Sequence, residues 1–192
     1  MMAHPRISRI RAASVATLAA LALFGCGKKE EPPKPQAAAP AAPPPPPTMT
    51  VRIGHVAPLT GGIAHLGKDN ENGARLAVDE ANAKGISIDG KKVTFELVAE
   101  DDQADPKTGT TVAQKLVDAK VAGVVGHLNS GVTIPASKIY SDAGIPMISG
   151  SATNPQVTEQ GFKTSFRVVG RDDQQGPAIA SYLAANNKPK VV

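Results

Sequence analysis

The chain has 192 residues, enough for one domain or a little more, and 41% of them are hydrophobic, which is sufficient for a globular core. Aromatic residues make up only 3% and tryptophan is absent, which argues against aromatic platforms for nucleobases. The formal net charge of +4 includes Arg6, Arg9 and Arg11, and residues 1–25 contain no acid, so the remainder carries about +1 and gives no indication of a nucleic-acid partner.

Residues 1–25 have the pattern of a secretory signal peptide. Three arginines precede an almost wholly apolar stretch from Ala12 to Phe24, which is shorter than the roughly 20 residues of a membrane-spanning helix. The stretch ends in Leu-Phe-Gly-Cys, which resembles the lipobox of bacterial lipoprotein precursors. This resemblance implies that Cys26 is lipidated and becomes the mature N-terminus. The alternative is a signal peptide cleaved elsewhere, with Cys26 incidental.

Cys26 is the only cysteine, so the chain has no intramolecular disulfide and no cysteine zinc cluster. The stretch that follows, GKKEEPPKPQAAAPAAPPPPPT, is dominated by proline and alanine and has too few apolar side chains to form a core. We therefore interpret residues 26–48 as the lipidated cysteine and a semi-extended linker that separates a folded domain from a membrane.

The globular part begins near Met49 and alternates between apolar strands and amphipathic helices. Met49–Ala57 predicts a first strand, a helix follows from Gly67 to Lys84, and Gly85 is a natural helix stop. The later predicted elements are a strand at 91–100, a helix at 106–119 capped by Asp105, a strand at 121–125, a helix at 133–143 and a strand at 146–148. This order predicts an α/β fold with a doubly wound parallel sheet, similar to a Rossmann fold.

The pattern changes after Pro155. The run at 163–169 indicates a strand, Asp172–Asn187 indicates a helix, and residues 188–192 resemble the beginning of another strand. A core strand without a following partner is a poor place for a domain to end. We therefore expect the chain to be a fragment of a longer, two-lobed protein.

Two small polar loops follow neighbouring predicted strands, at 128–131 and 149–154. Ligands of open α/β sheets bind at the carboxyl ends of the strands, so these loops are the candidate site for a small polar ligand. The sequence shows no acid–base pair and no metal-ligand cluster there. Asp101 and Asp102 are adjacent on an extended segment and point apart, which favours loop and capping roles. His127 near Ser130 lacks the G-x-S-x-G arrangement of a nucleophile elbow, so we interpret its imidazole as structural.

Four stretches together resemble the substrate-binding proteins of branched-chain amino acid ABC transporters, the Leu/Ile/Val-binding family with the type I periplasmic-binding-protein fold. They are IGHVAPLTGG with its following helix, VAEDDQADP, GHLNSGVTIPAS with IYSDAGIPMISGSATNP, and FRVVGRDDQQGPAIASYL. The resemblance covers about residues 49–192. It implies a first ligand-binding lobe at 49–170 and the truncated start of a second lobe at 171–192, with most of that second lobe missing.

The resemblance also implies ligand contacts at four positions. Ser130 stands where the family binds the α-carboxylate, Ser151 where a backbone carbonyl receives the α-ammonium, and Thr153 where the amino-acid head group is bound. Leu66 falls where a relative has an aromatic residue against the ligand side chain, and this difference affects the expected ligand. The alternative is that the two serines and Thr153 are only cap or turn residues and that Leu66 is ordinary packing.

The resemblance predicts a binding protein and not an enzyme, with no catalytic residues, no cofactor and no metal. It would be a lipid-anchored protein of the periplasm or cell envelope, a monomer when complete, that captures a small amino acid of the branched-chain type for an ABC permease. One alternative is a ligand-sensing module of the same fold that acts on a receptor. Another is a binding protein for an amide or other small polar solute.

Overall fold

The computed structural model describes residues 44–186. The predicted signal peptide, Cys26 and most of the linker lie outside this range, as does the strand expected at 188–192. The described part contains eleven elements: β1 (Thr48–Ala57), α1 (Ala64–Ala83), β2 (Ser87–Ile88), β3 (Lys91–Asp101), α2 (Pro106–Asp118), β4 (Gly123–Gly126), α3 (Ser130–Asp142), β5 (Met147–Ser149), α4 (Gln156–Glu159), β6 (Ser165–Arg167) and α5 (Asp172–Ala185).

The strands form one six-stranded sheet in the order β2-β3-β1-β4-β5-β6. Every neighbouring pair is parallel except β2 with β3, which is antiparallel. The chain leaves β1 toward β3 on one side and later returns to place β4 on its other side, so the winding direction reverses at β1. The predicted doubly wound parallel sheet is therefore confirmed, with a short antiparallel edge strand added.

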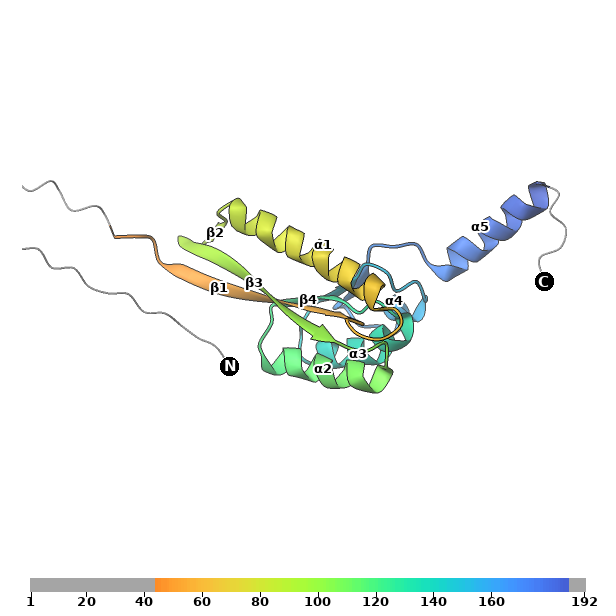
Figure 1. The fold of residues 1–192 in the computed structure, drawn as a ribbon, viewed down its shortest axis with the longest axis horizontal. Helices are drawn as coiled ribbons and strands as arrows, with labels where there is room; N and C mark the ends of the chain where they lie inside the picture. Colours follow the sequence, from red (N-terminus) through yellow and green to blue (C-terminus); the bar gives the residue numbers. More distant parts are fainter. Residues whose placement is uncertain (1–43, 187–192) are drawn as a thin grey trace, which may run out of the picture. The chain divides into compact units, whose positions relative to one another are not determined.

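Helices cover both faces of the sheet (Figure 1). Helix α1 lies over β1 and β3 on one face, and α2 and α3 pack together on the opposite face. The central core lies between the sheet and the α2–α3 pair, where Leu116, Tyr140 and Met147 are almost completely buried. A Cβ atom at Gly54 would meet the side chains of Leu116 and Val124, so β1 packs closely beneath α2.

Local sequence signals set several helix ends as predicted. The carboxylate of Asp105 accepts a hydrogen bond from the backbone N–H of Thr108 at 2.7 Å, with Pro106 as the first residue of α2. Gly85 follows α1 with a φ of +65°, a left-handed conformation that glycine adopts readily. A side-chain hydrogen bond therefore defines the beginning of α2, and a glycine in the left-handed conformation defines the end of α1.

Other boundaries differ from the prediction. Helix α3 begins at Ser130 and not at Thr133, because the carbonyl of Asn129 already accepts the N–H of Thr133 at 2.9 Å. Helix α1 begins at Ala64, three residues before the predicted start. Strand β2 and helix α4 were not predicted, since two and four residues are too few to show a periodicity.

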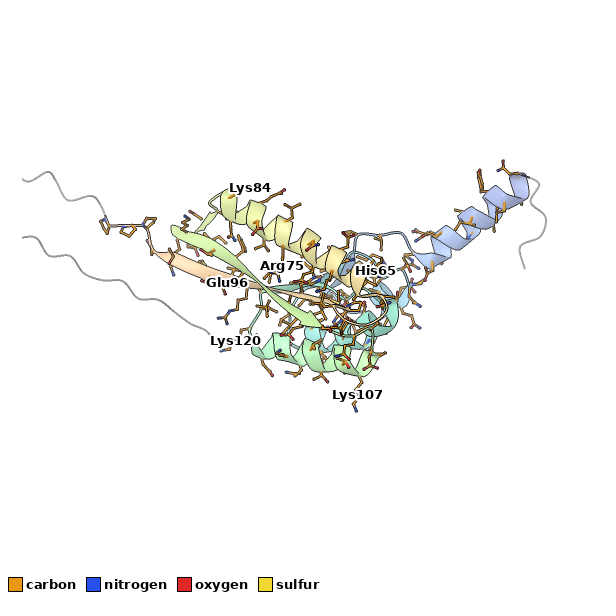
Figure 2. The ribbon with its side chains drawn as sticks, viewed as in Figure 1. His65, Arg75, Lys84, Glu96, Lys107 and Lys120 are labelled. Atoms are coloured by element: carbon orange, nitrogen blue, oxygen red, sulfur yellow. The ribbon has the colours of Figure 1, made fainter. Side chains whose placement is uncertain are left out.

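Exposed lysines lie in or beside α1 and α2. Figure 2 shows Lys84 beside the end of α1, Lys107 in the first turn of α2 and Lys120 after α2. Lys115 pairs with Glu100 of β3 at 2.7 Å. Within residues 44–186, no helix combines the length and the apolar character needed to cross a membrane.

Candidate functional site

The candidate site lies at the carboxyl ends of β4 and β5. Because these strands are parallel neighbours, the loops that follow them leave the same edge of the sheet. The hydroxyl of Ser130 accepts a hydrogen bond from the backbone N–H of Asn154 at 3.2 Å. The hydroxyl of Ser151 donates to the carbonyl of Leu128 at 3.0 Å. The structure therefore joins the segment from Leu128 to Ser130, where α3 begins, to the loop with Ser151 and Thr153.

Ser130 is the first residue of α3, a helix of 13 residues. The first amides of a helix have no carbonyl partner within the helix, and the helix dipole favours an anion at this end. The Ser130 hydroxyl accepts from Asn154 and so retains its own proton for donation. The end of α3 with Ser130 can therefore bind a carboxylate.

Ser151 and Thr153 lie in the loop after β5 and are both half-buried. The carbonyl of Thr153 accepts the N–H of Asp172 at 3.0 Å, which ties this loop to the start of α5. The loop is also held by Arg167 of β6, whose guanidinium donates to the carbonyl of Asn154 at 2.7 Å and that of Pro155 at 3.0 Å. Sequence reasoning did not find Arg167, because a lone arginine in an apolar strand has no distinctive pattern.

Leu66 lies in the first turn of α1, and 46% of its surface is exposed. The side-chain amide of Asn70, one turn further along α1, donates to the carbonyl of Leu66 at 3.1 Å. The oxygen of the same amide lies 3.7 Å from the position that a Cβ atom at Gly150 would occupy. The beginning of α1 is therefore adjacent to the loop after β5, and Leu66 is an exposed apolar group near it.

Asp101 fixes the loop after β1. Its carboxylate accepts the N–H of Leu59 at 2.8 Å, the hydroxyl of Thr60 and the N–H of Gln103 at 2.9 Å. Partial burial disfavours the charged carboxylate, but the hydrogen bonds from Thr60, Gln103 and Leu59 outweigh it and lower the pKa of Asp101. The loop role predicted for this aspartate is confirmed.

Asp102 points the other way, into the interior. Its Oδ2 lies 2.8 Å from Nδ1 of His127, and Nε2 of the same ring lies 3.1 Å from the hydroxyl of Tyr140. All three residues are fully buried. The structural interpretation of His127 agrees with this geometry, because both ring nitrogens are occupied inside the protein and Ser130 is not among their partners.

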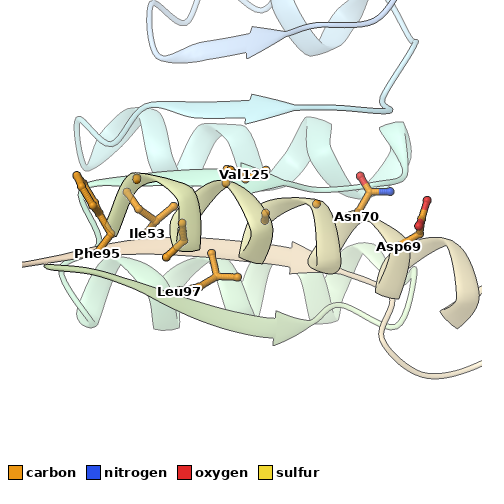
Figure 3. A pocket seen from close by; sticks show the side chains of 11 residues that line it. Ile53, Asp69, Asn70, Phe95, Leu97 and Val125 are labelled. Atoms are coloured by element: carbon orange, nitrogen blue, oxygen red, sulfur yellow. The ribbon is translucent and has the colours of Figure 1, made fainter. Parts of the chain in front are cut away.

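A cavity of about 540 Å³ lies elsewhere, between α1 and the sheet. Figure 3 shows Ile53, Leu97 and Val125 beneath α1, with Asn70 and Asp69 toward its beginning. Its lining is mainly apolar and includes none of the four predicted ligand residues. Within residues 44–186, no group of three His, Cys, Asp or Glu residues is placed to hold a metal ion.

The family model for periplasmic binding proteins matches residues 50–192. The chain belongs to this family. A Leu/Ile/Val-binding protein homolog of Brucella abortus is 46% identical over 138 residues, which are 72% of this chain and 36% of the relative. The Leu/Ile/Val-binding protein BraC3 of Rhizobium johnstonii is 44% identical over 142 residues, covering 74% of this chain and 38% of the relative.

Solved structures agree with the fold. The branched-chain amino acid binding protein LivJ from Streptococcus pneumoniae, in complex with isoleucine, matches with a TM-score of 0.64 and 36% identity over 71% of this chain and 38% of that one. A solute-binding protein from Rhodopseudomonas palustris BisB5, in complex with 3,4-dihydroxybenzoic acid, matches with a TM-score of 0.60 and 26% identity over 72% and 37%. The chain thus spans little more than a third of the length of these relatives.

Proposed function

We propose that this chain forms one ligand-binding lobe of an extracytoplasmic solute-binding protein that captures a small amino acid of the branched-chain type for an ABC importer. The observation that carries the proposal is the joining of two polar loops at the carboxyl edge of the sheet, where the hydroxyl of Ser130 binds the backbone of Asn154. The relatives named Leu/Ile/Val-binding proteins support the substrate class.

Each predicted residue has a role that its position allows. The hydroxyl of Ser130 and the first amides of α3 would bind the ligand carboxylate. The carbonyl of Ser151 would accept a hydrogen bond from the ammonium group, and the hydroxyl of Thr153 would bind the same head group. Leu66, exposed at the beginning of α1, would contact an aliphatic side chain. These are binding contacts and require no covalent step.

The proposed cycle is closure of a cleft around the ligand. Ligand contacts made with both lobes stabilise the closed form over the open form, which is how binding can be coupled to delivery to a permease. One lobe supplies only its own half of these contacts, so the affinity of this chain for an amino acid would be weak. Cys26 would carry the lipid that anchors the protein at the cell envelope, with residues 27–48 as the tether.

Weak binding can be tested by NMR on residues 26–192 with Cys26→Ser, titrated with leucine, isoleucine and valine. We expect saturable amide shifts at Ser130, Ser151 and Thr153. Ser130→Ala should weaken binding by about tenfold to a hundredfold, because a hydrogen bond to a charged group is lost. Ser181→Ala, on the exposed surface of α5, is the matched control. Absence of site-specific shifts up to the solubility limit of leucine would contradict the proposal.

A different solute is the second candidate, favoured by the aromatic carboxylate in the Rhodopseudomonas palustris relative. Leu66 in place of an aromatic residue is compatible with such a ligand. Titration with 3,4-dihydroxybenzoic acid in the same assay distinguishes the two candidates. Shifts at the same loops with this compound, and none with branched-chain amino acids, would retain the binding role and reject the amino-acid class.

Lipid anchoring needs its own measurement. The full-length chain, expressed in a bacterium that processes lipoproteins, should yield a mature N-terminus at Cys26 with the mass of attached acyl chains. It should fractionate with membranes, and Cys26→Ser should release it. An unmodified mature N-terminus at another residue would reject the anchor.

A further inference from the structure

We propose that Asp102, His127 and Tyr140 are positioning residues that fix the shape of both loops of the proposed ligand site. The inference rests on the proposed function for its purpose, but its geometry is independent of any ligand. The three side chains form a buried row, with hydrogen-bond distances of 2.8 Å and 3.1 Å on the two sides of the imidazole. Asp102 and His127 directly follow β3 and β4, and Tyr140 lies in the last turn of α3.

The row is connected to the site through the backbone of His127. The carbonyl of His127 accepts the hydroxyl of Ser149 at 2.7 Å. The oxygen of that hydroxyl in turn accepts the backbone N–H of Ala152 at 3.0 Å and of Ser151 at 3.4 Å. Asp102 is therefore linked to the amides of the loop that carries Ser151 and Thr153 by hydrogen bonds on either side of His127, whose covalent frame joins its ring to its carbonyl.

The same carbonyl also affects the other loop. It lies 3.3 Å from the hydroxyl of Thr133, whose side chain also donates to the carbonyl of Asn129 at 2.9 Å. Asn129 immediately precedes Ser130, so the position of His127 influences where α3 begins. Holding the imidazole at both nitrogens fixes this backbone, and the backbone fixes the two loops relative to one another.

The other end of the row anchors the loop after β3. The second oxygen of Asp102 accepts the N–H of Ala104 at 3.0 Å. Ala104 and its neighbour Gln103 have φ values of +57° and +54°, a region that residues other than glycine seldom occupy. Asp102 thus has one oxygen committed to its own turn and the other to His127.

The arrangement indicates which proton each group carries. Burial, with the charge of Asp102 as a smaller contribution, raises the pKa of Tyr140, so its hydroxyl stays protonated and can donate to Nε2 of His127. The opposite nitrogen, Nδ1, then carries the hydrogen that Asp102 accepts. An imidazole with its hydrogen on Nδ1 and a lone pair on Nε2 satisfies both neighbours.

Asp102→Asn tests this arrangement without removing volume. The amide oxygen would remain on the Ala104 side, which turns its NH₂ group toward His127. The imidazole must then accept at Nδ1 and carry its hydrogen on Nε2. Side-chain ¹⁵N NMR distinguishes the two tautomers, so the expected signature is a switch from the Nδ1–H form to the Nε2–H form.

The functional readout is amide hydrogen exchange, measured without ligand on residues 26–192 with Cys26→Ser. In Asp102→Asn we expect the amides of Ala152 and Asn154 to exchange about tenfold faster or more, since a hydrogen bond to a charged group is lost. The amides of Val124 and Met147, which bond to neighbouring backbone in the sheet, should keep their rates. Asp118→Asn removes an exposed carboxylate on α2 and should leave both sets unchanged.

Tyr140→Phe provides a second test if Asp102→Asn does not fold, because it removes only the hydroxyl that faces Nε2. It should accelerate exchange of the same loop amides. Unchanged loop exchange in a folded variant with a perturbed imidazole would overturn the inference. Equal acceleration of loop and sheet amides would also overturn it, since the three residues would then stabilise the whole fold and not the two loops in particular. If the wild-type chain fails to bind any amino acid, the proposed function is rejected. The exchange experiment still tests the positioning role, because it is measured without ligand.

Discussion

The imidazole of His55 lies in the interior of the protein. Its side chain is on β1 beneath α1, and the residue is 1% exposed. Neither ring nitrogen has a hydrogen-bond partner among the described residues, although the backbone of Val125 lies close to the ring. Burial is the largest effect on its pKa and lowers it. Glu71 and the backbone of Val125 oppose this shift, while His127 and Arg75 add to it.

A lowered histidine pKa makes stability depend on pH in a defined direction. As the pH falls through the ordinary value of about 6.5, the unfolded chain binds a proton at this histidine more readily than the folded chain does. Stability contributed by His55 should therefore fall as the pH drops below about 6.5, by at most about 1.4 kcal/mol per pH unit. Urea unfolding between pH 5 and pH 7 measures this slope.

His55→Leu should flatten that slope and raise stability at the acid end, because the buried polar ring is replaced by an apolar group. His65→Gln is the matched control, since it removes an exposed histidine at the beginning of α1 and should leave the slope of the parent. A parent and a His55→Leu variant with equal slopes would show that burial of His55 does not contribute to acid sensitivity.

At the scale of elements, α2 and α3 approach closely at a glycine. A Cβ atom built at Gly109 of α2 would clash with Cγ1 of Val132 in α3 and would lie 3.7 Å from the ring of His127. Val132 is almost fully buried, so it has little room to move. The contact between the two helices therefore depends on the absence of a side chain at this position.

Gly109→Ala should lower the free energy of unfolding by about 1–3 kcal/mol, because overpacking outweighs the gain in helix propensity. Gly73→Ala on α1 is the matched control, since its Cβ atom would meet nothing within 4 Å. That substitution should stabilise the protein by about 1 kcal/mol. Denaturant melts of the two variants give both signs, and equal effects would contradict the packing explanation.

The elements also show what the sequence can and cannot reveal. The Asp105 cap and the stop at Gly85 were predictable because the signals lie within a few residues of the helix ends. The joining of the two site loops followed from parallel neighbouring strands. The pair between Asp102 and His127 was not predictable, since 25 positions separate two residues that become partners only when β3 and β4 flank β1. The contacts of Arg167 have the same cause.

At the scale of the whole sheet, one face is covered unequally. Val125, Ile148 and Phe166 are register partners across β4, β5 and β6, so they form one row on one face. Exposure increases along the row, from half-buried Val125 to 37% at Ile148 and 49% at Phe166. On the opposite face, Val124 and Met147 are nearly fully buried against the helices. The sheet is thus apolar on both faces. On the face that carries Val125, Ile148 and Phe166, α1 is the covering helix within residues 44–186, and it shields only the β1 and β3 side.

This bare row should bind an apolar dye. Residues 26–192 with Cys26→Ser should enhance the fluorescence of 8-anilinonaphthalene-1-sulfonate while keeping native circular dichroism, because Ile148 and Phe166 form a contiguous apolar surface. Phe166→Thr should reduce the enhancement strongly and retain strand propensity. Ile88→Thr, at an equally exposed residue on the distant edge strand β2, should change it little. Equal losses from both substitutions would show that the dye reports scattered apolar side chains and not the row.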